Sequence, residues 1–145
     1  MYSGTTIGNR SGHLIGVHQR IDRIAMRHIA PVLPAGMAFP SVKEILYFEG
    51  NNGPDGIKRK SPSVDEPWHY IDPTKEHDRS IIDMIIDHQA NLAAALASGD
   101  EKRAAFEAAW MSHAIVDGLT PAHHVPFGDQ IEELFGIPHI ERKTV

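Results

Sequence analysis

One stretch organises this chain: Trp110-Met111-Ser112-His113-Ala114-Ile115-Val116-Asp117-Gly118-Leu119-Thr120-Pro121-Ala122-His123-His124. Its first part has the composition of a helix, and Pro121 marks a turn at its end. His113 and Asp117 are four residues apart, so on a helix both side chains point to the side that Trp110 also occupies. Burying an imidazole and a carboxylate is costly unless they are paired or bind a metal. The stretch therefore predicts the main metal-binding element of the protein, with two further imidazoles just past the helix end.

The composition indicates a globular protein that must bind any transition metal through nitrogen and oxygen. The chain has 145 residues, of which 41% are hydrophobic, which predicts one domain spanning residues 1–145. A net charge of −5 without a long run of one sign argues against a general nucleic-acid binder. The absence of cysteine excludes disulfides and thiolate zinc sites. Histidine, aspartate and glutamate remain as ligands, and the chain contains ten histidines.

The sequence carries no targeting or membrane signal. Residues 1–10 lack the basic start and the apolar run of a secretory signal, and no apolar stretch is long enough to cross a membrane. We therefore expect a cytoplasmic protein, or a secreted one if a leader has been removed. No specific protein partner is indicated.

Apolar periodicity and helix-end signals predict a mostly α-helical architecture. The expected helices cover residues 12–29, 42–48, 76–97 and 100–119, with a weaker one over 129–135. Their ends are marked by Pro31, by a capping box of Ser41 and Glu44, and by Gly99 followed by Asp100. The last two long helices should form an antiparallel hairpin because their link is so short. Residues 49–66 have the composition of a long loop that packs back on the bundle.

The first helix is expected to place its histidines at the surface. Its period is set by Leu14, Val17, Ile21, Ile24, Ala25 and His28. His18 lies on a different side of this helix. Taken from the residues alone, His18 and His28 are therefore surface or helix-end histidines, and Asp55, between a proline and a glycine, is an ordinary turn residue.

A family resemblance gives these residues a specific meaning. The pattern His113-x3-Asp117-x3-Pro121-x-His123 at the end of a long helix resembles the motif of the zinc-dependent phospholipase C family and of the related single-strand-specific nucleases. Gly12-His13-Leu14 resembles the start of the family's first helix. Trp68-His69-Tyr70-Ile71-Asp72 resembles its His-aromatic-Ile-Asp segment, and Asp55 stands where the family has a loop aspartate. The resemblance covers about residues 12–124 and implies a mostly α-helical bundle of the zinc phospholipase C/nuclease type.

The resemblance implies up to three zinc ions, of which one has a complete ligand set in this chain. That set is Asp55, His69, His113 and Asp117. Asp117 would also bridge to a second zinc held by His13, and His123 would bind a third. The family's N-terminal tryptophan is replaced by Met1-Tyr2, and no His-x3-Glu or His-x3-Asp follows His123. The chain is therefore expected to be a fragment lacking a C-terminal ligand helix, or to have a naturally reduced site.

The expected function is a zinc-dependent phosphodiester hydrolase. The metal would activate a water to attack phosphorus, with Asp55 as general base, and the substrate would be a phospholipid headgroup or a nucleic acid. Two alternatives remain open at the level of the sequence. An HD-type phosphohydrolase would use the dyad His77-Asp78, and a non-catalytic metal-binding domain would retain a degenerate site.

Overall fold

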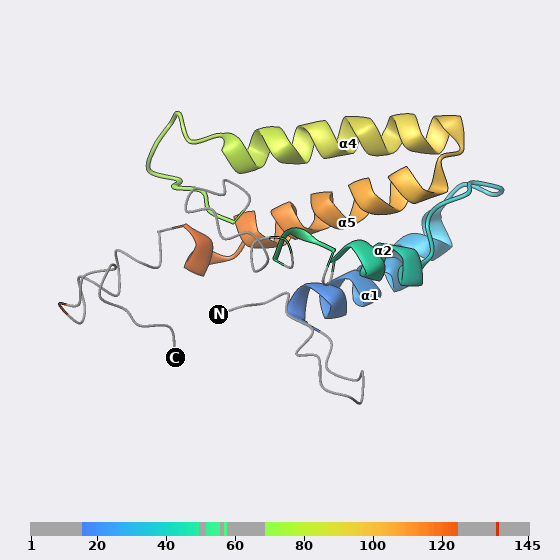
Figure 1. The fold of residues 1–145 in the computed structure, drawn as a ribbon, viewed down its shortest axis with the longest axis horizontal. Helices are drawn as coiled ribbons and strands as arrows, with labels where there is room; N and C mark the ends of the chain where they lie inside the picture. The colour runs from blue at the N-terminus through green and yellow to red at the C-terminus, as the bar shows by residue number, and fades with distance from the viewer. Residues whose placement is uncertain (1–15, 50–51, 56, 58–68, 125–135, 137–145) are drawn as a thin grey trace.

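The computed structural model describes residues 16–49, 52–55, 57, 69–124 and 136, and these residues are mostly α-helical, without a β-strand (Figure 1). This confirms the mostly α expectation. The expected residues 12–15 of the first helix and the helix over 129–135 lie outside the described part. The elements in chain order are α1 (Val17–Ile29), the 3₁₀ turn η1 (Ala30–Val32), α2 (Val42–Glu49), α4 (Ser80–Ser98), α5 (Glu101–Gly118) and the 3₁₀ turn η2 (Pro121–His123).

Helix α5 is the centre of the arrangement. It lies alongside α4 in an antiparallel hairpin, and α1 and α2 cover its other side (Figure 1). Four fully buried alanines, at positions 104, 105, 109 and 114, let neighbouring helices approach α5 closely. The main apolar core gathers around its N-terminal half and consists of Ile45, Leu92, Ala95, Ala104, Ala108, Ala109 and Trp110. The C-terminal half of α5 contacts polar groups of α1 and α2 as well as the buried Ile81 of α4.

Local hydrogen bonds confirm the predicted start of α2 and the predicted turn from α4 to α5, whereas α4 begins at Ser80 and not at the predicted residue 76. The backbone N–H of Ser41 donates to Glu44 Oε2 at 2.8 Å, which is half of the predicted capping box. Gly99 ends α4 with φ +73°, a left-handed conformation that favours glycine. Asp100 then accepts a bond from the N–H of Arg103 at 2.9 Å and starts α5. Gly99 and Asp100 together produce the tight hairpin between α4 and α5.

Helix α1 packs with its polar side inward, which overturns the prediction that His18 lies at the surface. His18 is 1% exposed, whereas Val17 and Ile24 are 50% and 54% exposed. Gln19 Nε2 donates to the carbonyl of Leu46 in α2 at 3.2 Å. Ser112 of α5 donates to the buried carboxylate of Asp22, again on this side. The helix is thus held by polar contacts, while His28, as predicted, is exposed.

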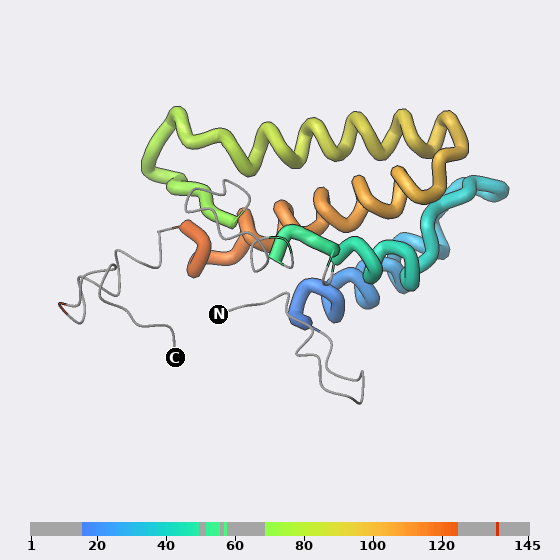
Figure 2. Tube along the Cα trace, in the orientation of Figure 1, coloured from blue at the N-terminus to red at the C-terminus, as the bar shows by residue number. Residues whose placement is uncertain are grey.

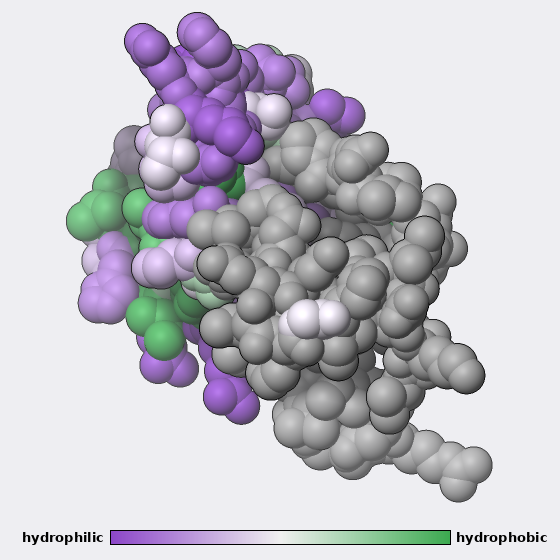
Figure 3. Space-filling view, turned by 90° about the vertical axis from the view of Figure 1, so that its left-hand side faces the viewer, coloured by the Kyte–Doolittle hydropathy of each residue, from purple (hydrophilic) through white to green (hydrophobic). Residues whose placement is uncertain are grey.

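The surface of the described residues mixes charged side chains with scattered apolar ones. Seen from the left-hand side of Figure 1, apolar side chains gather beside hydrophilic ones (Figure 3). The large exposed apolar residues include Ile82, Ile86, Ile115 and Leu119 near the open end of the hairpin. No helix in the described part of the chain has the length and apolarity that a membrane span requires.

Candidate metal centre

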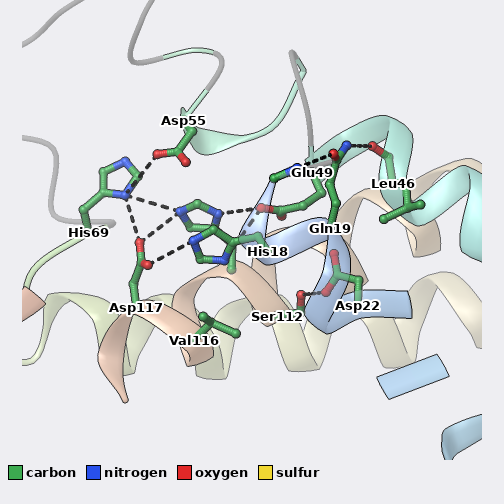
Figure 4. Close-up of polar contacts among 12 residues, drawn as sticks. His18, Gln19, Asp22, Leu46, Glu49, Asp55, His69, Ser112, Val116 and Asp117 are labelled. Carbon is green, nitrogen blue, oxygen red and sulfur yellow. Dashed lines mark hydrogen bonds and ion pairs between the residues drawn. The ribbon is translucent and has the colours of Figure 1, made fainter. Parts of the chain in front are cut away.

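Polar side chains from six segments converge at the C-terminal half of α5, and Figure 4 shows most of them. Helix α5 contributes two of them, four residues apart, and both are at most 1% exposed. The others come from the first turn of α1, the last residue of α2, the turn after α2, the segment before α4, and η2. The cluster consists of His18, Glu49, Asp55, His69, His113, Asp117 and His123.

Asp117 is the hub of this cluster, since its two oxygens face different histidines. Oδ2 lies 3.0 Å from His69 Nδ1 and 3.0 Å from His113 Nε2. Oδ1 lies 3.2 Å from His18 Nε2 and 3.5 Å from His123 Nε2. A buried carboxylate thus stands among four imidazoles. The i,i+4 spacing that the sequence showed accounts for one of these contacts, and tertiary packing supplies the other three.

A close backbone approach at Gly53 brings Asp55 to the cluster. A Cβ atom at this position would lie 2.5 Å from the carbonyl oxygens of Phe48 and Glu49, so only glycine fits without a shift. The chain then begins a helical turn at Pro54, and the N–H of Ile57 donates to the carbonyl of Gly53 at 3.0 Å. Asp55 Oδ1 ends 3.8 Å from His69 Nδ1. The tight turn at Gly53 therefore places the carboxylate of Asp55 beside His69.

Backbone bonds tie the segment that carries His69 to η2. The N–H of Ile71 donates to the carbonyl of His123 at 3.0 Å, and His123 Nδ1 donates to the carbonyl of His69 at 2.5 Å. Because a carbonyl only accepts, Nδ1 of His123 carries the proton and Nε2 is left to face Asp117. Residues 69–79 then lead away from the site to the start of α4 (Figure 2).

The buried charges shift one another's pKa values. Burial lowers the pKa of His113, but hydrogen bonds to Asp117 and Glu49 outweigh this effect and raise it from 6.5 to about 10. Burial raises the pKa of Asp117, but hydrogen bonds from His113, His18 and His69 hold it far below its ordinary value. Burial also raises the pKa of Glu49, against the bond from His113. Without a metal, His113 is thus an imidazolium between two carboxylates.

The donor atoms fit a divalent metal ion. Asp117 Oδ2, His69 Nδ1 and His113 Nε2 form a triangle with sides of 3.0, 3.0 and 3.3 Å. Two ligands of a tetrahedral zinc ion lie about 3.3–3.4 Å apart, given zinc–ligand distances near 2.0–2.1 Å. Within the described residues, Glu49, Asp55 and Asp117 form ion pairs only with histidines. A divalent ion would therefore also compensate buried negative charge.

The structure brings most of the predicted ligands together and adds two residues that the sequence did not reveal. Asp55, His69, His113 and Asp117, the predicted four-ligand set, lie together, and His123, predicted to bind a separate zinc, also faces Asp117; His13 lies outside the described residues. His18 and Glu49 were missed. The spacing of His18 and Asp22, four residues apart on α1, was an available signal for His18, because it indicates a polar stripe. Nothing in the sequence distinguished Glu49 from an ordinary helix-end glutamate.

The dyad of the HD-type alternative lies apart from this cluster. His77 is exposed. Asp78 Oδ2 accepts a bond from the backbone N–H of Asp72 at 2.8 Å, which gives it a structural use in the turn before α4.

Comparison of the chain with protein-family models, with curated proteins and with solved structures finds no match.

Proposed function

We propose that this protein is a zinc-dependent phosphodiester hydrolase with a site similar to that of the phospholipase C family. The observation that carries the proposal is the buried carboxylate of Asp117 among four imidazoles. A structural ion pair needs one partner, and this arrangement supplies four. Mixed imidazole and carboxylate ligands without cysteine are typical of zinc sites that keep a position open for water or substrate.

The residues divide into those that hold the metal and those that face the substrate. His69, His113 and Asp117 would hold the ion, with Asp55 completing the set. When bound, zinc polarises a phosphoryl oxygen and provides an activated water near neutral pH. Asp55 and His123 have the most exposed side chains of the cluster, at 10% and 18%, so the substrate would approach on their side.

Asp55 is placed to act as the general base. Its Oδ1 faces His69, whereas Oδ2 is buried and has no hydrogen-bond partner among the described residues. A carboxylate with one free oxygen at the edge of the site can accept the proton of an attacking water. Asp55→Asn keeps the size and one acceptor oxygen but removes the basic group, so we expect it to lower kcat more than zinc affinity.

Hydrolysis of a simple diester tests the function. The zinc-loaded chain should hydrolyse bis(4-nitrophenyl) phosphate, and chelation of the metal should abolish the reaction. We expect His113→Ala to remove activity, and the exposed His77→Ala to leave it unchanged. Activity that survives His113→Ala but is lost in His77→Ala would favour an HD-type phosphohydrolase. Phosphatidylcholine vesicles and single-stranded DNA as substrates would then separate a phospholipid headgroup from a nucleic acid.

A non-catalytic metal-binding domain is the second candidate. The observation in its favour is the small number of ligands facing Oδ1 of Asp117, where only His18 and His123 approach within the described part of the chain. Tight zinc binding together with no hydrolysis of any phosphodiester would establish this reading and overturn the first.

A further inference from the structure

Two stacked imidazoles connect two buried carboxylates at the centre of the molecule. The rings of His18 and His113 are parallel within 18°, with centroids 4.0 Å apart. Asp117 and Glu49 lie on opposite sides of His18 (Figure 4). His113 presents Nε2 to Asp117 Oδ2 at 3.0 Å and Nδ1 to Glu49 Oε1 at 2.8 Å. His18 presents Nε2 to Asp117 Oδ1 at 3.2 Å and Nδ1 to the same glutamate oxygen at 3.8 Å.

The two histidines therefore have the same orientation. A carboxylate only accepts hydrogen bonds, so Glu49 holds a proton on Nδ1 of His113 at 2.8 Å, and at 3.8 Å it faces Nδ1 of His18 as an ion-pair partner. On both rings Nε2 is the nitrogen that faces Asp117, and a bound metal ion would replace the proton that Nε2 of His113 carries without a metal. Metal-binding histidines characteristically donate their other ring N–H to a carboxylate or carbonyl, which fixes the tautomer and the ring orientation. His113 meets this requirement through Glu49, and His18 has the same orientation from a different helix, with the same Glu49 oxygen 3.8 Å from its Nδ1.

We propose that His18 is a metal ligand through Nε2, at a second ion position on the Oδ1 side of Asp117, and that Glu49 is the positioning residue for both histidines. The inference rests on the metal site of the proposed function. It assigns to His18, five residues further along the chain, the position that the family resemblance gave to His13. The carboxylate of Asp117 would bridge the two positions, since each of its oxygens faces a different set of imidazoles.

The stoichiometry of zinc bound to the full chain tests the assignment of His18. Metal-free protein is titrated with zinc in the presence of a chromophoric chelator, and bound ions are counted by mass spectrometry of the metal. The wild-type chain should bind at least two ions, and His18→Ala should bind one fewer. The matched control is His28→Ala, which removes an exposed histidine from the same helix and should leave the count unchanged.

Glu49 is tested by the strength of binding and by the tautomers of the histidines. Glu49→Ala should weaken zinc binding about 10- to 100-fold, the usual effect of losing a partner of a metal ligand. Glu49→Gln should recover most of the affinity, because its amide oxygen can still accept from His113. The control is Glu107→Gln. Glu107 is a buried carboxylate on α5 that pairs with His88 and Arg103, so this substitution should not change zinc affinity.

Nitrogen-15 NMR of the zinc-loaded wild-type chain provides a readout that needs no variant to fold. His18 and His113 should both show a protonated Nδ1 and the shifted Nε2 resonance of a metal-bound nitrogen. The proposal is overturned if the wild-type chain binds fewer than two ions, if His18→Ala keeps the full count, or if Nε2 of His18 shows no metal shift. Diester hydrolysis with an unchanged count in His18→Ala would refute this inference alone. A reduced count in a chain without hydrolysis would refute only the proposed function.

Discussion

Gly53→Ala should disrupt the candidate site by a steric effect that can be worked out from the backbone. The added Cβ would lie 2.5 Å from the carbonyl oxygens of Phe48 and Glu49, whereas ordinary contacts begin near 3.4 Å, so the backbone must shift by about 0.9 Å. Neither carbonyl can rotate away as a side chain could. Forcing atoms into packed space typically costs about 1–3 kcal/mol. For a chain of this size, about 2 kcal/mol corresponds to a Tm lower by about 4–8 °C.

The same shift should weaken zinc binding, because Gly53 lies between Glu49 and Asp55. We expect denaturant unfolding of the metal-free Gly53→Ala chain, followed by circular dichroism, to show the loss of stability, and a zinc titration to show a lower affinity. The control is Gly118→Ala, next to Asp117, where a Cβ would meet Ile81 Cγ2 at an ordinary 3.6 Å. Alanine there should stabilise the helix by up to about 1 kcal/mol. A Gly53→Ala chain as stable as the wild type, with unchanged zinc affinity, would refute the steric reasoning.

Three further predictions concern buried carboxylates. Asp117→Asn should weaken zinc binding by more than about 100-fold, because it removes the charge that faces four imidazoles; a calorimetric zinc titration that gives the wild-type affinity would contradict this. Glu107→Ala should lower the free energy of unfolding by about 2–3 kcal/mol, since it leaves the partly buried His88 without its ion pair, but zinc affinity should stay the same; denaturant unfolding and a zinc titration check the two parts, and a loss of zinc would show that the regions are coupled. Burial raises the pKa of Asp22 above its ordinary 3.8, although the hydrogen bond from Ser112 opposes this shift. The native state therefore keeps this proton to a higher pH than the unfolded chain does. The free energy of unfolding should fall as the pH rises from about 3.8 through the raised pKa. Asp22→Asn keeps an acceptor for Ser112 and should remove that part of the fall, which unfolding of the metal-free protein measured at several pH values detects; an unchanged pH profile would show that the pKa of Asp22 is not shifted.

The predictable part of the fold was the part that depends on local signals. Ser41, Gly99 and Asp100 act through residues at most four positions away, and the structure has each of them in its expected place. The orientation of α1 was not predictable, because it is decided by partners that are distant in the sequence. The apolar residues Val17 and Ile24 suggested one buried face, and contacts to α2 and α5 buried the opposite face.

The candidate site likewise contains residues that local spacing predicts and residues that only tertiary packing brings in. The i,i+4 pair of His113 and Asp117 was visible because helix geometry alone places both side chains together. Glu49 reaches the cluster because α2 packs against α5 and ends beside His113. Its role depends on packing over 64 positions of sequence, which no periodicity encodes.

Anomalous diffraction at the zinc edge, from crystals of the full chain grown with zinc, would locate the bound ions directly. We expect a strong peak in the anomalous difference map at the centre of the cluster, about 2.0–2.2 Å from Asp117 Oδ2, His69 Nδ1 and His113 Nε2. A map that shows zinc only at exposed histidines such as His28 and His77, with no ion beside Asp117, would overturn the proposed metal centre.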